Sequence, residues 1–326
     1  MVNNPSYLFL YNSGEFQRRV ESLEARLTDC DLCPHNCRID RRMKTGVCRS
    51  GMVPVIASVC AHHGEEPPLS GSRGSGTIFF GNCNMKCAYC QNYQISQDRN
   101  CLCGKEMDNE TLARQLIALQ NDARCHNINF VSPSHFVPQM ARAIFTAVPL
   151  GLRLPIVYNT GGYDSVDVLR LLEGIVDIYL PDIRYADDKI AEKYSGVKNY
   201  VTVNHAAILE MHHQAGLLQE DADGIAQKGM IVRHLILPNR LAGSSESLRW
   251  LAKNVSPDVF MSVMSQYYPA HHAGHFPELA RRINQAEYDE VVSILNELGM
   301  ENGWIQDMES PDNYRPDFQK EGHPFG

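Results

Sequence analysis

Three closely spaced cysteines are the residues of this sequence that most clearly suggest chemistry. Cys83, Cys87 and Cys90 form a CxxxCxxC pattern directly after the apolar run TIFF, which predicts a strand. Four thiolates would close a zinc site or fully ligate a cubane 4Fe-4S cluster, but this loop offers three. Three thiolates leave one iron open to bind and reduce a substrate. The alternatives are a structural zinc site completed by another residue, or unligated core cysteines.

A second group of cysteines precedes this loop, in a segment with little apolar periodicity. The four members are Cys30, Cys33, Cys37 and Cys48. Four thiolates in so short a segment predict a closed metal site, either structural zinc or a second 4Fe-4S cluster, and the spacing does not separate the two. A second cluster would be able to relay electrons to the first, whereas zinc would not.

The distribution of the cysteines argues against a disulfide framework. All 11 fall between Cys30 and Cys125, whereas disulfides of a secreted protein should spread through the folded mass, and an odd count leaves one thiol unpaired. Two tight groups in a reducing compartment indicate metal instead. The remaining cysteines are interpreted as small buried hydrophobes or incidental thiols, and they are Cys60, Cys101, Cys103 and Cys125.

Composition and charge exclude several classes of protein. The 326 residues include 30 basic and 38 acidic side chains, for a net charge of -8, and 44% are hydrophobic, which is ordinary for a globular protein and excludes collagen-like and disordered chains. The acidic balance argues against a nucleic acid partner or an anionic membrane, because both need a field of Lys and Arg. No apolar run reaches membrane-helix length and no signal peptide is evident, so a cytoplasmic location without membrane attachment is expected.

The elements that must position the cysteines alternate between strands and helices. A helix is predicted over about 14–28, and a Gly, Ser and Pro-rich stretch at 65–76 marks a module boundary. Beyond it, amphipathic helices alternate with strands, and the segment 200–213 is interpreted as helix. The six predicted strands are 77–80, 127–132, 154–159, 176–180, 230–237 and 259–264. Such repeated units predict an α/β fold, either an open doubly wound sheet or a partial barrel, with ligands at the carboxyl ends of the strands.

The cysteine motif, with aromatic Tyr89 before its last cysteine, resembles that of the radical S-adenosylmethionine (SAM) superfamily. The resemblance extends over about residues 30–306, through NINFVSPSHFVPQ, LPIVYNTGGY, VDIYLPDIRYADD, GMIVRHLILPN and SVMSQYYP. In order, these segments are similar to those of uncharacterised relatives of pyruvate formate-lyase activating enzyme.

The resemblance implies a fold and a domain organisation. The expected fold is a partial (β/α)6 TIM-type barrel with a small N-terminal cysteine-rich metal-binding segment. The expected division is 1–75 for the four-cysteine segment, 76–285 for the barrel, and 286–326 for a C-terminal helix and tail.

The resemblance also implies cofactors, an activity and contacts. A 4Fe-4S cluster on Cys83, Cys87 and Cys90 would bind SAM and cleave it reductively to a 5′-deoxyadenosyl radical, which abstracts hydrogen from an unidentified substrate, with a glycyl residue of a partner enzyme as one candidate. An electron donor such as flavodoxin or ferredoxin would supply the electron. The residues implied to contact SAM, besides Tyr89, are Asn159, Thr160, Asp182, Arg184, Arg233 and Gln266.

One segment departs from the superfamily pattern. A Gly-Gly-Glu type segment usually follows the second barrel strand and holds the SAM amino group, whereas here the run is Ser132-Pro133-Ser134-His135. The hypothesis is that Ser132 and Ser134 replace that contact, since hydroxyls can accept hydrogen bonds. His135, at the same rim, is a candidate contact to SAM or substrate. A function from another class remains as the alternative: a non-catalytic iron-sulfur or zinc protein acting in electron transfer or assembly.

Overall fold

A ten-stranded sheet organises the chain, and the computed structural model describes residues 5–98, 104–308, 316–319 and 324. Cys101 and Cys103 lie outside these residues. The strands are β1 (Val55–His62), β2 (Ser75–Phe80), β3 (Lys105–Glu106), β4 (Ile128–Val131), β5 (Ile156–Thr160), β6 (Ile178–Pro181), β7 (Gln219–Glu220), β8 (Ala226–Leu235), β9 (Phe260–Met264) and β10 (Gly303–Ile305).

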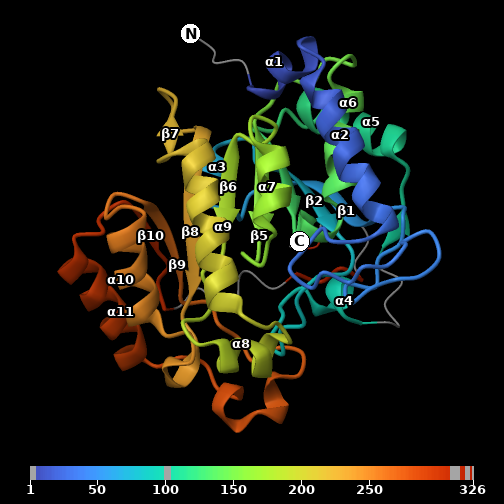
Figure 1. Cartoon of the computed structure of the whole chain (residues 1–326). Coiled ribbons are helices and arrows are strands. Elements are labelled where there is room, and N and C mark those ends of the chain that lie inside the picture. The colour runs from blue at the N-terminus through green and yellow to red at the C-terminus, as the bar shows by residue number, and fades with distance from the viewer. Residues whose placement is uncertain (1–4, 99–103, 309–315, 320–323, 325–326) are drawn as a thin grey trace.

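Helices connect the strands, and most of the longer ones cover one side of the sheet (Figure 1). They are α1 (Tyr7–Asn12), α2 (Glu15–Ala25), α3 (Pro67–Ser70), α4 (Tyr93–Ser96), α5 (Asn109–Asn121), α6 (Val137–Ala147), α7 (Val166–Leu172), α8 (Asp188–Ser195), α9 (Tyr200–Ala215), α10 (Ser244–Asn254) and α11 (Gln285–Leu298). In Figure 1, α7 and α9 stand in front of β5 and β6, while α10 and α11 lie to the left of β8. None of the helices in the described part of the chain is long and apolar enough to span a membrane.

The strand order is β10-β9-β8-β6-β5-β4-β2-β1-β3, and β7 pairs separately with β8. Every pair from β2 to β10 along this order is parallel, whereas β1 is antiparallel to both β2 and β3. The six predicted strands are confirmed as β2, β4, β5, β6, β8 and β9, and the α/β fold with an open, mostly parallel sheet agrees with a partial barrel. Strands β1 and β10 extend the sheet beyond the six predicted units.

Side-chain periodicity explains why the helices form where they do. In α5 the buried side chains include Leu112, Leu116 and Leu119, which repeat at helical spacing and face the sheet. The N-cap Asp108 side chain accepts a hydrogen bond from Thr111 N at 2.7 Å, which satisfies one of the free backbone donors at the start of α5. The predicted helices over 14–28 and 200–213 are likewise confirmed, as α2 with a following 3-10 turn and as α9.

Two apolar layers flank the sheet. The larger one fills the space between the helices and the sheet. The smaller one lies on the other face, where Leu69 of α3 packs with Val157, Ile178 and Ile231. The segment between β1 and β2 therefore enters the concave side of the sheet, where Asn127 Nδ2 donates to the carbonyl of Leu69 at 2.8 Å. This places Glu65 and Glu66, which immediately precede α3, near the carboxyl ends of the parallel strands.

Candidate active site

The loop after β2 carries Cys83, Cys87 and Cys90 and is held against α8. Lys86 N donates to the carbonyl of Ser195 at 2.8 Å, at the last residue of α8. The Cys87 Sγ atom accepts from Ser195 Oγ at 3.0 Å and lies 3.8 Å from Arg184 Nη1. These contacts orient the Cys87 thiol toward the residues that follow β6.

A chain of hydrogen-bonded hydroxyl groups leads from Ser195, the partner of the Cys87 thiol, to two buried tyrosines. Tyr89 OH and Tyr185 OH lie 2.6 Å apart, and Tyr185 OH is 2.6 Å from Ser195 Oγ. The Tyr89 ring packs against Tyr267 with 5.7 Å between ring centroids. The Tyr89 side chain is therefore buried, and its contacts help to fix the conformation of the cysteine loop. Its assignment as an adenine contact stays a prediction.

The thiols of Cys83, Cys87 and Cys90 are the donor set expected for a 4Fe-4S cluster, in which each thiolate binds a different iron. Burial raises the pKa of Cys83, and it raises the pKa of Cys90 to about 12, with further contributions from the neighbouring thiols. Thiols of this kind bind a metal by releasing their protons to it. In the described part of the chain, no three His, Cys, Asp or Glu side chains are gathered closely enough to hold one metal ion. The fit to a cluster rests on the donor set, three mutually interacting thiols beside an arginine.

A polar cavity of about 170 Å³ opens next to this loop. Residues from the carboxyl ends of several strands line it together with Gln91 and Asn92, which follow the last cysteine of the motif. Seven of the residues predicted to contact SAM line this cavity: Ser132, Asn159, Thr160, Asp182, Arg184, Arg233 and Gln266. The strand ends thus gather residues that are up to 134 positions apart in the sequence.

Asp182 is the centre of the charge network in this cavity. Its Oδ1 accepts from Arg233 Nε at 2.8 Å, and its Oδ2 accepts from Arg184 Nη2. Arg233 Nη2 also donates to Asn159 Oδ1 at 2.6 Å. The Asp182 side chain is only 5% exposed, so the pair with Arg184 is buried and not a surface ion pair. A cavity with both signs of charge suits SAM, which carries a sulfonium, an ammonium and a carboxylate.

Buried polar side chains from α9 hold the loops that follow β5 and β6. Asn204 Nδ2 donates to the carbonyls of Gly162 and Asp182, at 3.0 and 2.9 Å. Tyr200 OH accepts from Arg184 N at 3.0 Å. The helix is predictable from the sequence, but neither Tyr200 nor Asn204 was predicted to have a role in the site. A polar residue on the buried face of a predicted helix, such as Asn204, is the one signal that would have pointed to them.

Ser134 and His135 lie behind the cavity wall. Ser134 Oγ is 3.2 Å from Thr160 Oγ1, and Ser134 is absent from the described cavity lining, whereas Ser132 is part of it. His135 Nε2 is 2.9 Å from the carbonyl of Gly81, and burial lowers the pKa of His135 to about 3, so the ring is neutral. The ring of His135 borders the four-cysteine segment, so a contact from His135 to SAM or substrate is not supported.

The four N-terminal cysteines surround one small cavity. Its lining contains Cys30, Cys33, Cys37 and Cys48. A Cβ atom on Gly46 would lie 2.8 Å from Cys37 Sγ, so only glycine leaves room for that sulfur. His35 Nε2 is 2.7 Å from the carbonyl of Asn84, a residue of the CxxxCxxC loop, which ties the two cysteine groups together. Four thiols are the donor set of zinc or of a second cluster, but in the described structure they are not gathered closely enough to hold one metal ion.

We expect Cys33→Ser to remove the metal of this segment and leave the iron of the other loop in place, because Cys33 is buried in the four-cysteine cavity. Iron and zinc analysis of anaerobically purified protein measures this. Loss of zinc alone identifies zinc, and loss of about half of the iron identifies a second 4Fe-4S cluster. Cys60→Ser is the matched control. Unchanged metal content in Cys33→Ser would contradict the predicted metal site.

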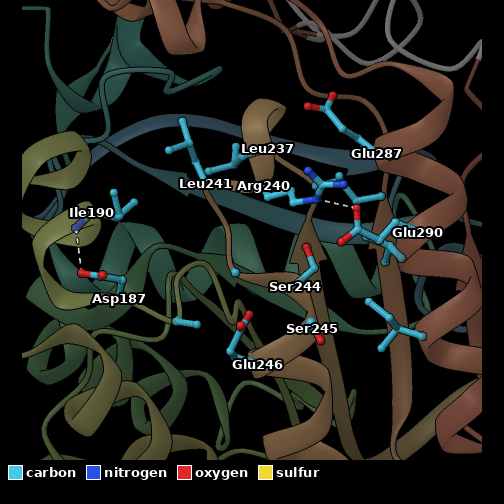
Figure 2. Close-up of a pocket in the computed structure, with 15 residues that line it drawn as sticks. Asp187, Ile190, Leu237, Arg240, Leu241, Ser244, Ser245, Glu246, Glu287 and Glu290 are labelled. Atoms are coloured by element: carbon cyan, nitrogen blue, oxygen red, sulfur yellow. Dashed lines mark hydrogen bonds and ion pairs between the residues drawn. The ribbon is translucent and has the colours of Figure 1, made fainter.

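A separate cavity of about 420 Å³ lies among α8, α10 and α11, where Arg240 Nε donates to Glu290 Oε2 at 2.6 Å (Figure 2). Glu246, at the start of α10, also lines it. Its described lining contains none of the predicted cluster or SAM residues. The charge in this cavity is therefore unrelated to the site beside the cysteine loop.

Residues 77–216 match the family model described as the radical SAM superfamily, so this part of the chain is a radical SAM domain. The cofactors of this superfamily, a 4Fe-4S cluster and SAM, are accordingly those of the domain. An uncharacterised protein of Methanocaldococcus jannaschii is 29% identical over 289 residues, which cover 87% of this chain and 79% of that protein. The similarity to activating enzymes in particular stays a proposal.

Solved structures of radical SAM proteins are also similar. A radical SAM methyltransferase from Sphaerobacter thermophilus is 13% identical, with a TM-score of 0.49 over 71% of this chain and 66% of that one. The AdoMet-bound protein anSMEcpe is 12% identical, with a TM-score of 0.46 over 67% of this chain and 57% of that one. The chain thus spans less than two thirds of either structure.

Proposed function

We propose that this chain is a radical SAM enzyme that uses SAM to abstract hydrogen from a substrate. When bound at Cys83, Cys87 and Cys90, the cluster supplies one electron for reductive cleavage of SAM to methionine and a 5′-deoxyadenosyl radical. The observation that carries the proposal is the convergence of seven predicted SAM contacts in one cavity that adjoins the cysteine loop. Each turnover consumes an electron, so an electron donor such as flavodoxin or ferredoxin is part of the proposal.

The residues of the cavity have distinct tasks in this proposal. Arg233 and Arg184 offer positive charge to the SAM carboxylate, and Asp182 holds both guanidinium groups in place. Asn159 fixes the other end of Arg233. Because these groups are already oriented before SAM binds, little ordering is needed when it enters. A glycyl residue of a partner enzyme is one candidate hydrogen donor, and this part of the proposal rests on the similarity to activating enzymes.

The test is an anaerobic assay of SAM cleavage. The protein is reconstituted with iron and sulfide, given SAM and a strong reductant, and 5′-deoxyadenosine is quantified. We expect production by the wild type and a fall to the protein-free background in Cys87→Ser, because the buried Cys87 thiol is one of the three cluster ligands. Cys125→Ser, which changes a buried cysteine outside the motif, should retain activity.

Two outcomes would contradict the proposal. If the wild type carries a full complement of iron yet makes no 5′-deoxyadenosine, the non-catalytic alternative is favoured. If Cys87→Ser is as active as the wild type, the cleavage takes place elsewhere in the molecule. Transfer of deuterium from a labelled candidate substrate into 5′-deoxyadenosine then identifies the hydrogen donor, including a labelled glycine in a partner protein.

A further inference from the structure

A larger cavity, of about 530 Å³, continues from the SAM cavity into the concave side of the sheet. The two cavities share Gly64, Glu65, Arg233 and Gln266 in their linings. Beyond these shared residues, the larger cavity is bounded by Glu66 from the segment before α3 and by Trp304 and Gln306 from the last strand and the residue after it. The two cavities therefore adjoin each other at these shared residues.

Three buried side-chain oxygens in the lining of this cavity have no hydrogen-bond donor among the described residues. Glu66 is only 9% exposed, and its Oε2 atom has no partner in the described structure. The side-chain oxygens of Gln266 and Gln306 are also buried without a partner among the described residues. A buried acceptor without a donor costs free energy, so a bound group that donates hydrogen bonds would be favoured here. The side-chain amides of the two glutamines can rotate to offer a nitrogen donor instead of an oxygen acceptor, so they do not select the charge of a bound group. An ionised carboxylate can only accept hydrogen bonds, so Glu66 is the residue that favours a positively charged group.

Glu65 and Glu66 place two adjacent carboxyl groups in the lining of the cavity. Burial raises the pKa of Glu65 above its usual range, and the adjacent Glu66 carboxylate raises it further. Arg233 is the cation that opposes this effect on Glu65, but its guanidinium already donates to Asp182 and Asn159. A cation bound between the two carboxyl groups would favour the ionised form of Glu65 and so lower its pKa.

The opposite wall of the cavity suits an aliphatic chain. Trp304 lines it and packs against Phe260 with 5.9 Å between ring centroids. Met264 from β9 and Pro67 from α3 are also part of the lining. A cationic group on an alkyl chain would place its charge at Glu66 and its methylene groups on these side chains, and the Trp304 ring can also attract a cation.

We propose that this cavity is the substrate pocket and that it binds a protonated amine or guanidinium group of the substrate, through Glu66 and its neighbour Glu65. The substrate role rests on the proposed function, whereas the binding of a cation does not. The cation can belong to a small molecule or to a lysine or arginine side chain of a protein substrate.

The experiment compares charged and neutral probes of the same shape. Butylguanidine and butylurea are titrated into the full-length protein, and their dissociation constants are measured by saturation-transfer NMR. An acetylated peptide with glycine next to arginine, and its counterpart with citrulline in place of arginine, test the protein source. We expect each guanidinium probe to bind at least about tenfold more tightly than its urea counterpart, as one charge-assisted hydrogen bond would give. Binding by butylguanidine indicates a small-molecule source, and binding by the peptide alone indicates a protein source.

Glu66→Gln should abolish this preference for charge, and Glu246→Gln, in the cavity of Figure 2, should retain it. The thermal midpoint of Glu66→Gln should equal or exceed that of the wild type, because Glu66 Oε2 has no partner to lose in the described structure. Should this variant not fold, the guanidine and urea comparison on the wild type decides alone.

The inference is overturned if the guanidinium and urea probes bind equally, if neither guanidinium probe binds, or if Glu66→Gln weakens SAM binding while the probes bind as before. Its failure is distinct from that of the proposed function. If the probes bind according to charge but no 5′-deoxyadenosine is produced, the cation-binding pocket is supported and the proposed radical SAM activity is rejected. If 5′-deoxyadenosine is produced but the probes bind without regard to charge, the activity is supported and the cation-binding pocket is rejected.

Discussion

Asp182→Asn is expected to lower the free energy of unfolding by about 3 kcal/mol, because it leaves two largely buried guanidinium groups without their shared carboxylate. In the folded protein Asp182 bridges Arg184 and Arg233, whose side chains are only 25% and 18% exposed. Asparagine keeps the shape of the side chain and removes its charge, so the effect reports the ionic contacts. Chemical denaturation of the protein without added SAM measures it.

The same variant should bind SAM at least about tenfold more weakly, because the two arginines would no longer be held in position. Equilibrium dialysis with labelled SAM measures this without requiring turnover. Asp258→Asn, which changes an exposed carboxylate beyond α10, should leave both measurements unchanged. If Asp182→Asn matches the wild type in stability, the bridge contributes no net stability, and its role would be limited to orienting SAM.

Gly162→Ala is the second substitution with a large expected effect. Gly162 follows β5 with a φ of 74°, a conformation that favours glycine. A Cβ atom there would overlap Asn204 Nδ2 and the carbonyl oxygen of Asp182, the two groups that hold the loops after β5 and β6 together. We expect a loss of about 3 kcal/mol in the free energy of unfolding, from the steric overlap and the backbone strain together.

Gly14 offers a control, because it has a φ of 76° in the left-handed region and no atom within 4 Å of an added Cβ. Gly14→Ala should therefore report the backbone strain alone, about 1 kcal/mol. The difference between the two variants isolates the overlap with Asn204 and Asp182. Equal losses of unfolding free energy in the two variants would show that Asn204 of α9 moves away from the added Cβ at little cost. SAM binding by Gly162→Ala should then be normal.

Much of the fold was predictable because the strands and helices carry strong local patterns. The six barrel strands are short apolar runs of fully or largely buried residues, such as Ile156–Thr160, and the helices between them repeat apolar residues at helical spacing. Strand β1 was missed because its sequence VIASVCAH is half-buried and lacks a regular alternation of apolar and polar residues. Strand β10 has three residues, and its pairing with β9 depends on a contact across about 40 residues of sequence.

The site was predictable in its residues more than in its arrangement. Residues just after parallel strands must meet at one rim, which is why Asn159, Asp182 and Gln266 line the same cavity. Ser134 could not be placed from its position in sequence, because a single turn after Ser132 directs it behind Thr160. Glu65 belongs to no strand of the barrel, and nothing local to it indicates that it enters the cavity.

The sequence by itself determined the cysteine motif and the order of the strands and helices around it. The spacing of Cys83, Cys87 and Cys90 after a strand and the order of the β-α units are local properties, and they sufficed to identify the radical SAM domain. Only the tertiary structure decided which polar groups lack a partner. Whether Glu66 is neutralised depends on every side chain that packs around it, from segments more than 200 residues apart. The charge of the substrate pocket is such a property, because burial and distance, and not the residue type alone, set the balance of charge.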